Sequence, residues 1–91
     1  MKQKDFVTGD LYLSAAIISL INTNPSFKTE NERVLFVFSI NEDLYKAMNA
    51  YHNGIPINAY EYAQIIKRLR AEMIMRRNNQ IIGHENRGAH E

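Results

Sequence analysis

Apolar positions gather first in one unbroken run near the start of the chain. Residues 11–21, LYLSAAIISLI, are apolar or small at nearly every position. Within the run, large apolar residues recur at spacings of three and four, which favours a helix over a strand. A helix that is apolar almost all round is a buried one. Asp10 is a good N-cap for this helix, and Pro25 stops it because proline cannot continue the hydrogen-bond ladder.

A second apolar stretch, RVLFVF at residues 33–38, has a different composition. Its β-branched and large apolar residues follow one another without a break, which is typical of a strand covered on both faces. The alternation of a strand puts Val34, Phe36 and Phe38 on one face, and Leu35 and Val37 on the other. Residues 27 and 28 supply the opposing arm of a hairpin across the polar turn 29–32. KDFVT at 4–8 predicts a short edge strand.

The segment SINE, residues 39–42, matches a capping box at the start of another helix. In this motif the Ser39 side chain caps the helix, and Glu42 reaches back from three residues further on. We expect the helix to run from about 41 to 52. Asn53-Gly54 ends it, because glycine readily adopts the left-handed conformation that a helix C-terminus favours.

NAYE, residues 58–61, is a second capping box, with Asn58 in the capping position. It predicts a last helix over about 59–77. Beyond Arg77 the chain loses its periodicity and becomes rich in Asn, Gly and His, so we expect residues 79–91 to form a flexible C-terminal tail. Residues 1–78 then form a single domain.

These elements predict an α+β fold. Their order is strand-helix-strand-strand-helix-helix, and the simplest arrangement is a small three-stranded antiparallel sheet packed by three helices. One buried helix covers one face of the sheet, and the other face needs the remaining helices or another subunit. If the three helices cannot cover both faces, dimerisation follows, so a homo-oligomer, with a dimer as the first guess, is the expected assembly.

The last predicted helix carries an uneven distribution of charge. On a wheel of about 100° per residue, its core stripe is Tyr62, Ile65, Ile66, Leu69 and Met73. One flank of that stripe, which we call the basic flank, holds Tyr60, Lys67, Arg70, Ile74 and Arg77. Arg68 lies on the other side, where Glu72 is four residues on and able to pair with it.

Three interpretations of the basic flank remain open. Its cations could contact phosphates, with Tyr60 available to stack on a base. It could be an ordinary solvated surface, whose long basic side chains lie over apolar neighbours and favour the helix macrodipole. It could also meet the acidic side chains of a second copy, an arrangement that Ile74 suits equally well.

The composition of the chain narrows the classes of function and of binding site that it can have. The formal net charge of +1 gives no strong overall attraction to nucleic acid or anionic membrane, so any such attraction is local. The chain has no Cys, its four glycines are isolated, and no nucleophile motif surrounds its serines. His84 and His90 lack the spacing of metal ligands. We expect no enzyme, no cofactor and no metal site.

The apolar run 11–21 imitates a secretory signal after the early lysines. Asp5 and Asp10 oppose that interpretation because they put acidic charge before the run, and no small-x-small cleavage site follows it. Eleven residues are also too few for a membrane span, which needs about 20. The expected location is the cytoplasm, with no membrane partner.

Three stretches, DFVTGDLYLSAA, RVLFVFS and AYHNG leading into YEYAQIIKRLRAEM, together resemble a small uncharacterised domain family. Its members occur in bacteria, archaea and their viruses. The shared pattern is Asp10 before the helix start, a hydrophobic strand that closes at Phe38, and Tyr51 before the last helix. The resemblance covers about residues 5–75. It implies a fold unit, a domain of unknown function, and no catalytic residue.

Overall fold

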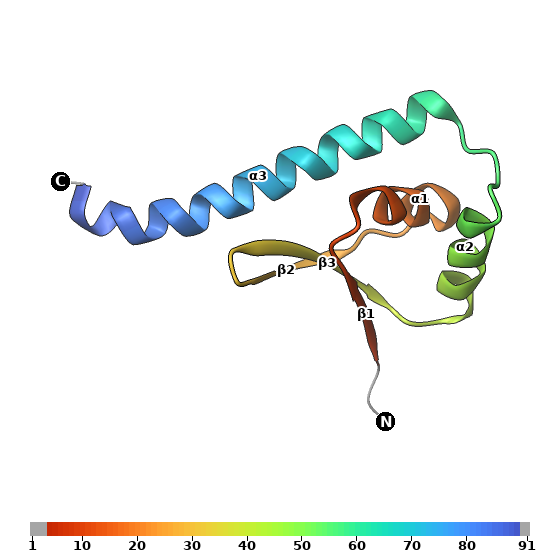
Figure 1. Ribbon diagram of the computed structural model, residues 1–91, viewed down its shortest axis with the longest axis horizontal. Helices are drawn as coiled ribbons and strands as arrows, with labels where there is room; N and C mark the ends of the chain where they lie inside the picture. The colour runs from red at the N-terminus through yellow and green to blue at the C-terminus, as the bar shows by residue number, and fades with distance from the viewer. Residues whose placement is uncertain (1–3, 90–91) are drawn as a thin grey trace.

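The computed structural model describes the backbone of residues 4–89 and the side chains up to residue 78. The elements follow the predicted order. They are β1 (Asp5–Thr8), α1 (Leu11–Ile21), β2 (Ser26–Glu30), β3 (Arg33–Ser39), α2 (Glu42–His52) and α3 (Ala59–Ala89). The predicted fold, a three-stranded antiparallel sheet packed by three helices, is confirmed (Figure 1).

The sheet has the order β1-β3-β2, with β3 antiparallel to both neighbours. β1 and β2 therefore run parallel to each other with β3 between them, and α1 makes the crossover. The hairpin from β2 to β3 closes with only two residues, because Glu30 pairs with Arg33. Those two residues, Asn31 and Glu32, both have positive φ angles, of 53° and 64°, which is the conformation of the tight hairpin turn. The turn is thus shorter than the predicted 29–32.

The core lies between one face of the sheet and the helices. Phe36 and Phe38 of β3 are buried against α1, whose Ile17 is fully enclosed. α1 is buried because it lies between the sheet and α3, with α2 beside it (Figure 1). This position explains its almost uniformly apolar sequence, as predicted.

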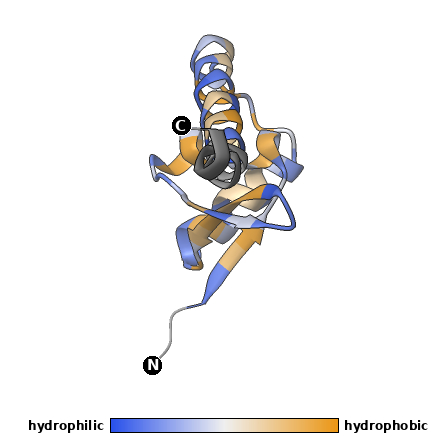
Figure 2. Cartoon of the chain, turned by 90° about the vertical axis from the view of Figure 1, so that its left-hand side faces the viewer, coloured by the Kyte–Doolittle hydropathy of each residue, from blue (hydrophilic) through white to orange (hydrophobic). Residues whose placement is uncertain are grey.

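Helices α1 and α3 lie on the same side of the sheet (Figure 2), and β3 buries Val34, Phe36 and Phe38 on that side. The expectation that β3 would be covered on both faces is therefore wrong for the chain by itself. Leu35 and Val37 on the far face are only partly buried, and Val7 opposite Val37 is 39% exposed. We call the face that carries these three residues the open sheet face. Its charged residues are Asp5, Lys28, Glu30 and Arg33.

Local capping explains where the helices begin. Asp10 accepts a hydrogen bond from the Leu13 backbone N–H at 3.1 Å, and Asn58 accepts one from Glu61 N–H at 2.8 Å, both as predicted. The predicted cap at Ser39 is wrong. β3 continues through Ser39, which pairs with Asp5, and Asn41 caps α2 instead through a 2.8 Å bond from Leu44 N–H.

The predicted end of the last helix near Arg77 is also wrong, because α3 continues to Ala89. The segment after Arg77 contains no proline, and a glycine such as Gly83 costs a helix only about 1 kcal/mol without breaking its hydrogen bonds. The C-terminal part of α3 extends past the β2–β3 hairpin (Figure 1). Flexibility of the proposed tail stays a prediction, and residues 90 and 91 lie outside the described part.

Candidate nucleic-acid interface

The basic flank lies along α3 as the helical wheel predicts. Its side chains are all exposed, and Tyr60 and Ile74 are 76% and 52% accessible to solvent. On the opposite side of the helix, Ile65 and Leu69 are buried in the core. Because α3 is anchored through that buried stripe, the flank is presented on a fixed backbone. Lys67 and Arg77 are separated by about 15 Å along the axis at 1.5 Å per residue.

The cations of the flank have no acidic partner among the residues whose side chains the structure describes. In that part of the chain the one ion pair joins Arg76 Nε to Glu72 Oε1 at 3.0 Å. Lys67, Arg70 and Arg77 therefore keep their charge available to an external anion. The predicted pair between Arg68 and Glu72 is wrong, because Glu72 pairs four residues forward rather than back.

Arg76 owes this position to the sheet. Its guanidinium lies 4.3 Å from the centre of the Phe27 ring of β2, a cation–π contact. Phe27 in turn meets Phe36 edge to face, with 5.6 Å between ring centres. Arg76 thus joins α3 to the hairpin and is a structural cation, distinct from the three on the basic flank.

Arg70 has a partner that the sequence pattern did not suggest. Its Nη2 donates a hydrogen bond to the hydroxyl of Tyr12, in the first turn of α1, at 3.4 Å. The Tyr12 side chain is 50% exposed, so its ring stands at the surface beside the flank. The contact joins residues 58 apart in sequence, and only the tertiary crossing of α1 and α3 brings them together. The one hint in the sequence was Tyr12 itself, an aromatic residue with a hydroxyl group inside a run of apolar and small residues.

A second tyrosine fixes the position of Tyr12. The Tyr62 hydroxyl donates a 2.9 Å hydrogen bond to the Tyr12 backbone carbonyl. Burial raises the pKa of the Tyr62 phenol, and the nearby Tyr51, Asp10 and Tyr12 raise this pKa further. The phenol therefore stays protonated at neutral pH and remains a donor. The start of α1 is therefore tied to α3 through both the backbone carbonyl and the side-chain hydroxyl of Tyr12.

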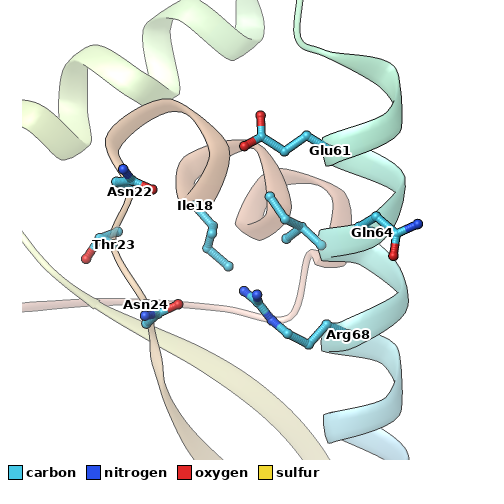
Figure 3. A pocket seen from close by; sticks show the side chains of 8 residues that line it. Ile18, Asn22, Thr23, Asn24, Glu61, Gln64 and Arg68 are labelled. Carbon is cyan, nitrogen blue, oxygen red and sulfur yellow. The ribbon is translucent and has the colours of Figure 1, made fainter.

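A separate cleft of about 500 Å³ lies on the other side of α3, next to the end of α1. Arg68 and Glu61 extend from α3 toward α1 there, whereas Gln64 is turned outward (Figure 3). The rim of the cleft is lined by Asn22, Thr23, Asn24, Glu61, Gln64 and Arg68. Most of these side chains are exposed, and the mixture of a cation, a carboxylate and amides favours no single ligand charge.

Within the described residues, no three His, Cys, Asp or Glu side chains gather closely enough to hold a metal ion. Over the same residues, no helix combines the length and apolar character that crossing a membrane demands. The statement on metal ligands does not extend to His84 or His90, since the His84 side chain and the whole of His90 lie outside the described part.

Comparison with known proteins finds no relative from which a function could be inferred. No family model matches the chain, and neither the curated proteins nor the solved structures contain a significant match. The resemblance to an uncharacterised domain family stays a prediction.

Proposed function

We propose that this chain is a non-enzymatic binding module that holds nucleic acid on the basic flank of α3. The observation that carries the proposal is the side-by-side exposure of Lys67, Arg70 and Arg77 on one rigid helix, with no carboxylate pairing them in the described residues. Unpaired cations in a fixed row suit a ligand whose charges are themselves in a row, and a phosphate backbone is such a ligand.

The chemistry of the flank fits phosphate contacts. Arginine guanidinium groups bind phosphate oxygens with two parallel N–H bonds, and a lysine supplies a point charge. Three cations spread over about 15 Å of helix reach several consecutive phosphates, since one strand of a duplex rises about 3.4 Å per phosphate. With a net charge of only +1, attraction comes from this local row, so binding should be modest and highly sensitive to salt.

The first prediction reverses two charges of the row. Lys67→Glu/Arg70→Glu should weaken binding to a labelled oligonucleotide more than about 100-fold at low salt, because two charge-assisted contacts become repulsive. Fluorescence anisotropy measures this loss, and far-UV circular dichroism checks that the helices remain. In the unchanged protein, log K against log salt concentration should fall with a slope between about −2 and about −3 for three phosphate contacts.

The matched control keeps the same net charge. Lys46→Glu/Arg68→Glu also reverses two exposed cations, one on α2 and one on the opposite flank of α3. It should retain most of the affinity and the salt slope. Equal losses in both double variants would mean that only overall charge matters. Undiminished binding by Lys67→Glu/Arg70→Glu would leave the flank as an ordinary solvated surface.

A second candidate function is homo-oligomerisation without any role for nucleic acid, and the open sheet face favours it. Helices pack on one side of the sheet, and no described residue forms a covering layer over Val7, Leu35 and Val37 on the other side. Ile74, half exposed in the middle of the basic flank, is the other place where a second copy could dock. The two surfaces predict different effects on self-association of a charge at Val37 and of a charge at Ile74.

A further inference from the structure

We propose that the basic flank takes unpaired, single-stranded nucleic acid, and that Tyr12 is a stacking residue of the same surface. This inference rests on the proposed function and narrows its ligand class. It starts from the contact between the Arg70 guanidinium and the Tyr12 hydroxyl, 3.4 Å apart. That contact places an aromatic ring of α1 directly beside the row of cations on α3.

The Tyr12 ring is held in place yet open to solvent. Its hydroxyl accepts from Arg70, its backbone carbonyl accepts from Tyr62, and half of its surface is exposed. A ring fixed in this way pays little conformational entropy when a base stacks on it. Tyr62 is partly buried and packs on the core, so it acts on the surface only by positioning Tyr12.

Tyr60 supplies a second ring at a different point along the same row. It lies on α3 about 10 Å along the axis before Lys67, and 76% of its surface is exposed. A large exposed aromatic residue at the first turn of a helix gains nothing from burial. Its exposure is explained if the ring meets a base.

Aromatic rings beside cations favour single-stranded over double-stranded nucleic acid. In a duplex the base faces are already stacked on one another, so a tyrosine at the outside of the backbone has no free face to cover. In a single strand the bases can turn onto aromatic rings while the phosphates stay on lysine and arginine, and each stacked base contributes about 1–3 kcal/mol. The pairing of Tyr12 and Tyr60 with Lys67 and Arg70 fits the second case.

The test measures anisotropy with labelled oligo-dT, oligo-U and a mixed-sequence DNA duplex of the same length. At least one single strand should bind about tenfold or more tightly than the duplex. Tyr12→Ala and Tyr60→Ala should each weaken single-strand binding about 5- to 100-fold, whereas Tyr12→Phe, which keeps the ring and loses the hydroxyl, should stay within about threefold. Thermal melting verifies that each variant is folded.

Tyr45→Ala is the matched control, because Tyr45 is 55% exposed but lies on α2, and it should leave the affinity unchanged. Two outcomes would reject this inference and leave the proposed function standing. In the first, the duplex binds as tightly as both single strands. In the second, Tyr12→Ala has no more effect than Tyr45→Ala, while Lys67→Glu/Arg70→Glu still abolishes binding. If none of the oligonucleotides binds, both the inference and the proposed function fail.

Discussion

Ser14 is a polar residue enclosed in the most apolar helix of the molecule. Its side chain is fully buried in α1, and its hydroxyl finds no hydrogen-bond partner among the described residues. A buried hydroxyl without a partner costs about 1–3 kcal/mol of desolvation, and serine is also a weaker helix former than alanine. The residue therefore lowers the stability of the position that it occupies.

We predict that Ser14→Ala raises the free energy of unfolding by about 1 kcal/mol, because it removes the unsatisfied hydroxyl and improves helix propensity. Urea denaturation followed by circular dichroism measures the change. Ser19→Ala on the same helix is the control, since Ser19 is only partly buried and should gain just the smaller propensity term. A loss of stability in Ser14→Ala would mean that the hydroxyl has a partner of its own.

Single residues were predictable wherever helix periodicity alone decided the outcome. The wheel correctly separated the buried Ile65 and Leu69 from the exposed Lys67 and Arg70, since that separation depends only on 3.6 residues per turn. The contact of Arg70 with Tyr12 was missed, because no local pattern encodes which side of α1 faces α3. The candidate surface thus grew by a residue that only the tertiary structure supplies.

Among the helices and strands, the start of α2 shows local and non-local signals in competition. SINE fits a capping box as well as NAYE does, yet only Asn58 of the second motif caps its helix. Ser39 is instead the last residue of β3, paired with Asp5 of the neighbouring strand β1, which is distant in sequence. Strand pairing with a distant segment extended β3 and shifted the cap two residues on, to Asn41.

This shift gives a prediction about helix α2. Asn41→Ala should lower the free energy of unfolding by about 1 kcal/mol, because it removes the side-chain oxygen that accepts from Leu44 N–H at 2.8 Å. Ser39→Ala is the matched variant and should change stability by less than about half of that, since Ser39 is exposed and caps nothing. Denaturant midpoints compare the two. The reverse ranking would restore Ser39 as the cap.

For the fold as a unit, the order of the elements and the antiparallel sheet followed from the sequence, but the coverage of the sheet did not. Leu35 and Val37 have the composition of a strand buried on both faces, and β propensity cannot say whether the cover comes from the same chain. Within the described residues Leu35 and Val37 stay only partly buried, so β3 is more apolar than this part of the chain requires. We propose a second copy of the chain as the cover of the open sheet face.

The distribution of charged residues on the open sheet face supports a second copy of the chain as its partner. Strand alternation places Asp5 at one end of the open sheet face, and Lys28, Glu30 and Arg33 at the other, around Val7, Leu35 and Val37. Glu30 is the cross-strand partner of Arg33, so this second end carries two cations and one carboxylate and stays basic overall. If a second copy packs face to face with its strands reversed, Asp5 of each copy approaches the basic end of the other. Such a two-fold arrangement uses the same patch twice and closes on itself, in the manner of aligned sheet packing.

The resulting dimer should be weak. Three short strands spaced about 4.8 Å apart present only about 300 Å² per copy, against about 800 Å² in a standard stable interface. We therefore predict that the mass measured by light scattering rises from monomer toward dimer only at high protein concentration. Val37→Lys should hold the protein at monomer mass, because it buries a charge at the centre of the contact without disturbing the opposite, core-facing side of β3.

Ile74→Lys is the comparison that separates the two candidate docking surfaces. Ile74 is half exposed on α3, so this substitution adds the same charge at a similar cost to the fold while leaving the open sheet face intact. If the sheet face is the interface, Ile74→Lys still dimerises and Val37→Lys does not. If the basic flank is the interface, the two variants exchange behaviour. Monomer mass at every concentration would reject self-association, and the apolar far face of β3 would then need a different partner.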